Sequence, residues 1–474
     1  MKLEKFLQTN YGYNPDAKNE IKTYVEQWKS WYQGNVKSFH NYFIYNGQKK
    51  VKKTRFTLNM AKEISEDWSD ILWSEECKIS MKDDSSQKDF DKLLDELDIN
   101  NIINQTLEKS GALGTSATVV SVYDIIKKED KMTLDVSNAK TRIDIVDVDD
   151  IYPLSWDNKG TTECAFSSAK YIAGVKYVIL SVHKIDEKSG NYVIYNHLFK
   201  DSNGNLTEIE QEDTLTFFDT KNNVPWFRLF EPLLTNNLFK NSPFGISHFA
   251  NAIDVMKTVD IDFDEFKNEV KDGRKRTFAS ADMFTYEDGT QKLVFDPNDT
   301  DIYMLPKGAN KDDFIQSDTS NLRVNDQIAA LNTSLNILGN KVGFGENHYH
   351  FDGTNLSTAT AVIASNSKMA RRMKKLQIGY ESAIYDLIKA VCYASTAFGK
   401  YNINTEDMAI AFDDSIIEDK ESESIRALRE YQAGLISGAE YRERIFGETE
   451  EIATQKFNEV QSAEPSTEDL MKEE

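Results

Sequence analysis

The residues with the clearest capacity for chemistry form the string His348-Tyr349-His350-Phe351-Asp352, which follows the motif HxHxD. Two histidines two residues apart on a strand can bind one metal ion together with a carboxylate. A metal ion held in this way can activate water for hydrolysis. The string therefore raises the hypothesis of a metal-dependent hydrolase.

The rest of the sequence does not complete such a site. The metal motif of the metallo-β-lactamase fold opens with the same string but next requires a histidine, and Gly353 stands at that position. The remaining histidines are isolated in the sequence, and the lone Gly343-Phe344-Gly345 has no strand before it. No GxxxxGK(S/T) phosphate-binding motif occurs. We therefore predict no catalytic residue, no metal and no cofactor, and interpret the segment that includes Asn347 as a polar loop between two helices.

A second pattern is basic. Lys368, Arg371, Arg372 and Lys375 recur at i, i+3, i+4 and i+7, so they share one face of a predicted helix. The opposite side carries Met369, Ala370, Met373 and Leu376. No acidic residue interrupts residues 366–380. A solvated face or ion pairs with a neighbouring subunit is the plainer interpretation, and contact with a polyanion such as DNA is the alternative.

Another basic cluster, Arg274-Lys275-Arg276, lies where a long predicted helix enters a short insert. It could contact either DNA or a protein partner. The helix before it has Phe249, Ile253 and Met256 at the start of a regular three- and four-residue spacing. Its polar faces carry Asp254, Asp262, Glu265 and Glu269.

The chain is acidic, with a formal net charge of −22 over 474 residues. Residues 413–474 hold eighteen acidic and seven basic residues, a net charge of −11, so half of the negative charge lies in the last eighth of the sequence. Phosphate contacts require lysine and arginine, so DNA would be contacted only locally or weakly. The three cysteines show no disulfide or zinc spacing, and no signal peptide or membrane-spanning run is visible. We expect a soluble protein made in the cytoplasm, with no membrane partner.

The apolar spacing predicts an α+β fold. Helical periods dominate the first 115 residues, and a period of two from about 118 to 218 predicts antiparallel strands with a hairpin turn at Ser202–Asn205. An insert with predicted turns at Asp288-Gly289 and near Pro297 separates two long helices. The second of these has a heptad-like seam from Val324 to Val342, which predicts packing against another long helix. A proline-free helical pattern from about 357 to 398 predicts a helix of about 60 Å, and short acidic helices follow.

Three sequence stretches, in this order, resemble the portal proteins of tailed bacteriophages that infect Gram-positive bacteria. They are FKNSPFGISHFANAIDVMKTVDIDFDEFKNEV, then VGFGENHYHFDGTNLSTATAVIASNSKM, then FDDSIIEDKESE with GLIS and YRERIFG after it. In the second stretch, Ala361 stands where the family usually has glutamate. The resemblance extends over nearly the whole chain.

The resemblance implies a portal fold with a mixed α/β wing, a long-helix stem, a small β-containing clip and a helical crown. The implied boundaries are wing 1–245, stem helix 246–272, clip 273–320, stem helix 321–342, tunnel loop 343–357, long helix and return to the wing 358–412, and acidic crown and tail 413–474. The tunnel loop would lie nearest the DNA, and its implied DNA-facing residues are Asn347, His348, Tyr349, His350, Phe351 and Asp352.

The resemblance also implies a function that is not enzymatic. Portal proteins form rings of about twelve subunits at one capsid vertex, through which double-stranded DNA enters and leaves. The implied partners are further copies of the chain, DNA, the terminase, head-completion or adaptor proteins, and the major capsid and scaffold proteins. The implied location is the virion, after synthesis in the cytoplasm of the host bacterium. A virion or scaffold protein that does not contact DNA is the other alternative.

Overall fold

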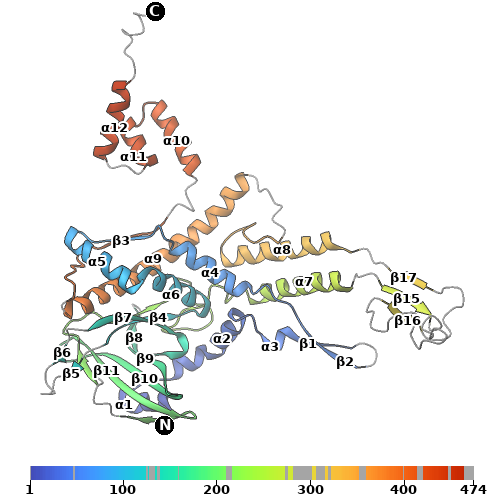
Figure 1. Cartoon of the computed structure of the whole chain (residues 1–474), viewed down its shortest axis with the longest axis horizontal. Helices are drawn as coiled ribbons and strands as arrows, with labels where there is room; N and C mark the ends of the chain where they lie inside the picture. The colour runs from blue at the N-terminus through green and yellow to red at the C-terminus, as the bar shows by residue number, and fades with distance from the viewer. Residues whose placement is uncertain are drawn as a thin grey trace, which may run out of the picture. The chain divides into compact units, whose positions relative to one another are not determined.

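The computed structural model describes most of the chain (Figure 1). The described residues are 2–45, 49–123, 126–127, 134–135, 139–157, 160–209, 216–272, 276–280, 302–305, 315–318, 322–351, 359–398, 400–413, 420–446 and 450–463. They form two compact units, one of residues 1–72 with 79–410 and one of residues 73–78 with 411–474. Helices and mostly antiparallel sheets alternate in long blocks, so the predicted α+β class is confirmed.

Helices dominate the start of the chain, as the apolar spacing predicts. They are α1 (Leu3–Tyr11), α2 (Asp16–Tyr32), α3 (Lys37–His40), α4 (Met60–Leu72), α5 (Asp84–Leu97) and α6 (Ile99–Leu113). Both α2 and α4 bury apolar residues at helical spacing, including Trp28 and Trp68, and α4 packs on α6. A two-stranded hairpin of β1 (Asn41–Tyr45) and β2 (Lys50–Thr54) interrupts this block, and β3 (Lys78–Ser80) follows α4.

An antiparallel sheet occupies the region of period two. Its order is β12-β11-β10-β9-β8, with β13 also paired to β11. The strands are β8 (Ile151–Asp157), β9 (Gly160–Ile172), β10 (Val175–Ile185), β11 (Tyr192–Ser202), β12 (Asn205–Glu208) and β13 (Phe217–Asp219). The predicted hairpin turn is confirmed: Asn203 and Gly204 both have positive φ, and the Asp201 carboxylate accepts the Gly204 N–H. A 3-10 turn, η1 (Val148–Asp150), precedes the sheet.

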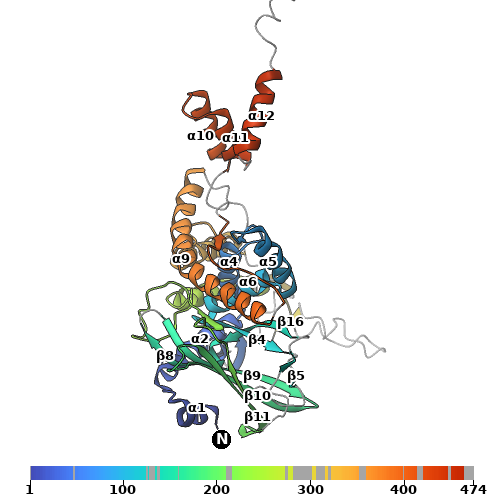
Figure 2. The same ribbon diagram turned by 90° about the vertical axis from the view of Figure 1, so that its left-hand side faces the viewer.

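Helix α1 covers one face of this sheet (Figure 2). Phe6 and Leu7 pack against Leu180, Val182 and Phe199, all of them buried. The Phe6 and Phe199 ring centroids lie 5.0 Å apart at 78°, an edge-to-face contact. The alternation of apolar and polar residues along β10 and β11 therefore supplies the apolar face that α1 requires.

A second sheet, in the order β14-β4-β7, lies among helices. It consists of β4 (Ser116–Tyr123), β7 (Lys140–Asp147) and β14 (Phe227–Phe230), and it contacts α6 and α9. Helix α9 runs from Ala359 to Ala397, and its 39 residues correspond to about 58 Å, as predicted. The Tyr380 hydroxyl of α9 lies 2.8 Å from the Ser110 hydroxyl of α6. Between β4 and β7 in the chain, the short strands β5 (Ile126–Lys127) and β6 (Leu134–Asp135) pair with each other. Strand β18 (Ala409–Ala411) follows α9.

Helices α7 (Ile253–Asp272) and α8 (Val324–Val342) pack against each other (Figure 1). The predicted seam of α8 is buried at Leu331, Leu335, Leu338 and Val342, which confirms the expected helix partner. Between the two helices in sequence lies a small sheet in the order β16-β15-β17. Its strands are β15 (Arg276–Ser280), β16 (Ile302–Leu305) and β17 (Ile315–Asp318), so the predicted β content of the insert is confirmed. The predicted turns at 288–289 and 297 lie outside the described residues.

Two carboxylates buried on α7 hold the β1–β2 hairpin. Asp260 accepts hydrogen bonds from the Thr57 hydroxyl (2.9 Å) and the Leu58 N–H (3.0 Å), and its other oxygen lies 3.2 Å from His40 Nε2. Because His40 Nδ1 accepts a hydrogen bond from the Val36 N–H, the ring proton is on Nε2, and Nε2 donates a hydrogen bond to Asp260. Burial raises the pKa of Asp260, and these hydrogen bonds oppose the rise.

The next turn of α7 repeats this arrangement. Asp264 accepts the Tyr42 hydroxyl at 3.0 Å and the Phe56 N–H at 3.1 Å. Acidic residues on another side of α7 reach α8. Asp262 accepts the Ser334 hydroxyl at 2.5 Å, and Glu269 accepts Arg323 Nε (3.2 Å) and Nη2 (2.9 Å). Helix α7 is therefore joined by carboxylates to the hairpin and to α8.

The second unit contains three short helices, α10 (Lys420–Gln432), α11 (Gly438–Phe446) and α12 (Glu450–Ala463). Tyr431 stacks on Tyr441 at 5.7 Å and meets the edge of Phe457. A Cβ at Gly438 would lie 1.8 Å from the Phe457 ring, so only glycine allows α11 to begin this close to α12. The predicted acidic helices are thereby confirmed up to Ala463, and so is a glycine-containing turn at Gly434 between α10 and α11.

We expect the substitution Asp260→Ala to destabilise the folded chain by about 3 kcal/mol, because it leaves three donors without their acceptor in a buried place. The matched control is Asp254→Ala on the same helix, where the side chain is 90% exposed and pairs only with Lys257. That change should cost less than about 0.5 kcal/mol. Denaturant unfolding of both variants measures the difference, and equal losses would contradict a structural role for the buried carboxylate.

Candidate functional site: the loop after helix α8

Glycines fold the chain tightly back at the end of α8. Gly343 has φ +103° and ends the helix, and the N–H groups of Gly343, Phe344 and Gly345 all point to the Gly339 carbonyl at 2.9–3.3 Å. A Cβ on Gly339 would approach the Gly345 carbonyl oxygen to 2.9 Å. The GxG at 343–345 is thus a helix terminus, as the absence of a preceding strand indicates, and it directs Phe344 toward α4.

A stack of three rings holds the beginning of the loop. The Phe344 ring lies 4.5 Å from buried Trp68 of α4 and 4.2 Å from the His348 ring, with interplanar angles of 21° and 5°. Trp68 Nε1 also donates to the Val342 carbonyl at 3.3 Å. The base of the loop is therefore fixed on α4, because stacked rings and a hydrogen bond join the same two segments.

Polar contacts fix the next residues. The Tyr349 hydroxyl donates to the Asp67 carboxylate at 2.8 Å, and His348 Nε2 lies 3.3 Å from the same oxygen. Burial, with the nearby Asp67 charge and this hydrogen bond, raises the pKa of Tyr349 well above its usual range. Tyr349 therefore stays a neutral hydrogen-bond donor. In this part of the loop only His348 among the predicted residues is exposed, next to exposed Glu346.

The last described residues of the loop dock on α7 and α8. The Asn347 N–H donates to Asn336 Oδ1 at 2.8 Å, and the Phe351 N–H donates to Asn332 Oδ1 at 2.9 Å. The Phe351 ring meets two phenylalanine rings of α7, with centroids 6.1 Å and 5.3 Å away. These partners are Phe263 and Phe266. The segment that we predict as a polar loop is thus, up to Phe351, packed against three helices.

The two histidines of the HxHxD string serve different contacts. His348 stacks on Phe344 and reaches Asp67, whereas His350 Nε2 lies 3.2 Å from Asn347 Oδ1. Asp352 lies outside the described residues. Within the part of the chain that the structure describes, no group of three His, Cys, Asp or Glu side chains could hold a metal ion.

The predicted basic face on α9 divides in two. Lys368, Arg371 and Lys375 are exposed, and Lys368 Nζ donates to the Asn340 carbonyl near the end of α8 at 2.7 Å. Arg372 instead turns inward over the Trp68 ring, 6.0 Å from its centroid, and burial lowers its pKa. A Cβ on Gly343 would lie 2.5 Å from Arg372 Cδ, so this glycine makes room for the arginine stem.

The third predicted cluster is only partly described. Arg274 and Lys275 lie outside the described residues. Arg276 begins β15, where its backbone stands opposite Asp318 of β17. The structure therefore brings Arg372 of α9 and the start of the loop together at Trp68, and it places Lys368 at the end of α8.

Sequence reasoning missed the residues that anchor the loop. Trp68 and Asp67 belong to α4, more than 270 positions before the loop, and no local pattern connects the two segments. The one available signal is the spacing Gly339-x3-Gly343-x-Gly345, which indicates a close backbone approach. It marks the fold of the turn but not its partner.

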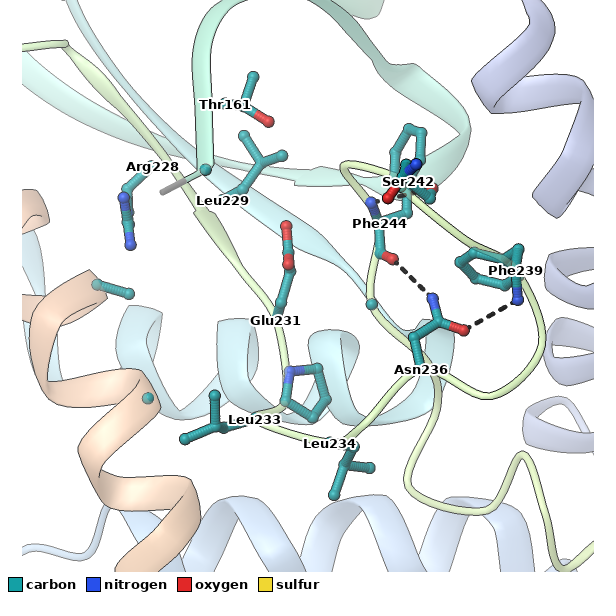
Figure 3. Close-up of a pocket in the computed structure, with 16 residues that line it drawn as sticks. Thr161, Arg228, Leu229, Glu231, Leu233, Leu234, Asn236, Phe239, Ser242 and Phe244 are labelled. Carbon is teal, nitrogen blue, oxygen red and sulfur yellow. Dashed lines mark hydrogen bonds between the residues drawn. The ribbon is translucent and has the colours of Figure 1, made fainter. Parts of the chain in front are cut away.

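A pocket of about 330 Å³ lies elsewhere in the first unit, between β14, the segment 231–245 and α9 (Figure 3). Figure 3 shows the carboxyl group of Glu231 pointing into it. Burial raises the pKa of Glu231 to about 7, and the charge of Arg228 opposes this rise. Arg228 Nη1 itself lies 3.3 Å from the Asp386 carboxylate.

Residues 12–466 match the family described as phage portal protein, SPP1 Gp6-like. The chain belongs to this family of phage portal proteins. The match covers both units and the helix pair α7–α8, so the predicted identity as a portal protein, a head-tail connector of a bacteriophage, is confirmed. The family is structural rather than enzymatic, which agrees with the prediction of a protein without catalysis.

Other comparisons are weaker. No curated protein matches the sequence. One similar solved structure is described as the neck of a native GTA particle computed with C12 symmetry, with 8% identity, a TM-score of 0.35, and coverage of 81% of this chain and 88% of that chain. Another is described as the neck of an empty GTA particle computed with C6 symmetry, with 9% identity and the same TM-score and coverage. No described helix is long and apolar enough to span a membrane.

The inward position of Arg372 gives a direct test. Arg372→Glu should lower the free energy of unfolding by roughly 2 kcal/mol or more, because it places a carboxylate in a desolvated place beside Trp68. Its neighbour Arg371 is exposed, and Arg371→Glu should cost less than about 1 kcal/mol. Equal effects of the two charge reversals in denaturant unfolding would show that Arg372 is not packed inward in solution.

The Glu231 carboxyl gives a pH-dependent prediction. Its folded pKa of about 7 lies above the usual 4.5, so the folded state binds the proton more tightly than the unfolded state. The stability that this carboxyl contributes is present below pH 4.5 and is lost as pH rises to 7 and above. The free energy of unfolding of Glu231→Gln, relative to that of wild type, should therefore rise by on the order of 2 kcal/mol as the pH goes from 5 to 8.

Denaturant unfolding at several pH values measures this gain. Glu265→Gln, at an exposed position of α7, is the control for the general effect of removing one carboxyl. A stability difference between Glu231→Gln and wild type that does not change with pH would contradict the raised pKa.

Proposed function

We propose that this portal protein forms a ring of about twelve copies around a channel for double-stranded DNA, at one vertex of the phage capsid. The single observation that supports this most is membership of the portal family over residues 12–466. A ring of long helix pairs also suits the chemistry of α7 and α8, which expose apolar residues such as Val270 and Ile337 beyond their own mutual contact. Those residues are available to neighbouring subunits.

The parts of the chain take the roles that the family implies. Helices α7 and α8, within 246–272 and 321–342, form the stem, and the small sheet within 273–320 forms the clip. The body within 1–245 and 358–412 forms the wing, and the acidic residues 413–474 form the crown and tail. Residues 343–357 form the tunnel loop. The support for these roles is the order of the elements, a helix pair that flanks a small sheet in sequence.

In this proposal the tunnel loop meets DNA without holding it. Among its described residues, 343–351, the exposed ones are Glu346 and His348, and Lys368 and Arg371 are exposed on α9. A strongly acidic chain repels phosphate, and a few local cations suffice for weak, salt-sensitive contact. Such a balance suits a conduit, because a channel that bound its cargo tightly would stop it.

The partners follow from the same assignment. The clip docks the terminase during packaging and later the head-completion or adaptor proteins, and Arg274, Lys275 and Arg276 lie at its start. The wing and crown contact the major capsid and scaffold proteins. The protein is a component of the virion that is made in the cytoplasm of the host bacterium.

The first experiment is native mass measurement of the purified chain, together with negative-stain electron microscopy. A ring of about twelve copies of a 54.2 kDa chain should weigh about 650 kDa, since 12 × 54.2 is about 650, and should show a central hole. Charge reversal of Lys368, Arg371 and Lys375 together should leave the ring intact and reduce DNA packaged per particle.

Particles without a central hole would contradict the channel. Full packaging by the triple charge-reversal variant would contradict the role of these three residues, while the ring itself would stand.

A further inference from the structure

One stretch of this acidic chain is free of acidic residues. From Gln27 to Lys62 the sequence holds eight lysines and arginines and no aspartate or glutamate. Its formal charge is +8, so the rest of the chain carries −30, since −22 − 8 is −30. The stretch includes α3 and the β1–β2 hairpin, which α7 holds through Asp260 and Asp264.

The hairpin has two different faces. In its antiparallel register Phe43 stands opposite Lys52 and Tyr45 opposite Lys50, so these four side chains share one face. All four are exposed, with 66% of Phe43 and 68% of Tyr45 accessible to solvent. The other face carries Tyr42, whose hydroxyl donates to Asp264. We name the outer hairpin face after its position and define it by Phe43, Tyr45, Lys50 and Lys52.

The cations of this stretch also divide in two. Lys29 and Lys62 pair with Asp149 and Glu108 inside the first unit. Arg55 lies over the Phe39 and Tyr42 rings and donates to the Phe39 carbonyl at 2.7 Å. Within the described residues, Lys50 and Lys52 form no ion pair. Positive charge and aromatic surface are thus left together on the outer hairpin face.

We propose that the outer hairpin face is an intersubunit contact that docks on an acidic surface of a second copy of this chain. This rests on the proposed ring. Charge complementarity favours a second copy, because the rest of every copy, outside this stretch, carries a formal net charge of −30. The exposed rings favour a protein partner, since protein interfaces bury aromatic side chains whereas DNA phosphates require only cations and donors.

The nature of the patch also selects the symmetry. A two-fold dimer places the same surface against itself, and two outer hairpin faces with like charge would repel. A basic patch that meets a different, acidic patch makes a head-to-tail contact instead, and such contacts close into rings when the rotation allows. The hairpin is therefore suited to a cyclic assembly, and it offsets part of the repulsion between strongly acidic subunits.

The test compares two variants with the same change of charge. Lys50→Glu with Lys52→Glu reverses the outer hairpin face, and Lys170→Glu with Lys200→Glu reverses two exposed lysines of the six-stranded sheet. Mass photometry from 50 to 500 mM salt measures assembly of each full-length variant. The hairpin variant should need at least tenfold more protein to assemble at low salt, and the control less than threefold. Phe43→Ser, which keeps the charge, should also weaken assembly.

A photo-crosslinking residue in place of Phe43 identifies what the face touches. Intermolecular crosslinks to an acidic peptide of another copy support the proposal, even if the assemblies are not closed rings, in which case the ring proposal alone fails. Rings that form equally well in the hairpin variant, without such crosslinks, overturn the hairpin proposal and leave the ring standing. Crosslinks to added duplex DNA with unchanged assembly overturn it in favour of a nucleic-acid contact. A wild-type chain without assembly or intermolecular crosslinks overturns both.

Discussion

The arrangement of the first unit depends on the burial of two carboxylates one turn apart on α7. Buried carboxylates are tolerated only when donors surround them, and a donor set assembled from several segments fixes those segments in one geometry. Asp260 and Asp264 draw their donors from His40, Tyr42 and the backbone at 56–58. Helix α7 also supplies the acidic partners of α8. This one helix therefore positions the hairpin, α8 and the loop after α8.

The same helix explains how an acidic protein presents a basic surface. Asp260 and Asp264, which face the hairpin, accept hydrogen bonds from hydroxyl and backbone N–H groups and form no ion pairs with the described lysines of the hairpin. Lys50 and Lys52, on the other face, are exposed to solvent and form no ion pair within the described residues. At ordinary salt, charges more than about 10 Å apart are largely screened from each other. A local basic patch can therefore decide whether two acidic subunits make contact at that place.

The sequence predicts the elements of this protein well because their signals are local. Alternation reveals the strands of the six-stranded sheet, and three- and four-residue spacing reveals α7, α8 and α9. The hairpin of β1 and β2 has a local signal too, in Asn46-Gly47, but the helical spacing that dominates the first 115 residues predicts no strands there. The position of Arg372 is not predictable from spacing, because it sits at the border between the exposed and buried sides of α9. Its stem turns inward because it packs over Trp68 of a distant helix and because Gly343 leaves room for it.

The contacts of the loop limit how it can respond to DNA. Moving residues 343–351 away from α4 requires separation of the Trp68–Phe344 stack and loss of the Tyr349 hydrogen bond to Asp67. An aromatic pair contributes about 0.5–1.5 kcal/mol beyond its burial, and a hydrogen bond to a charged group about 1.5–3 kcal/mol. Phe351 adds its contacts with α7 at the other end of the segment. If α8 shifts slightly and these contacts are kept, α4 and the loop must shift with it. Residues 343–351 therefore move together with their helices and not independently of them.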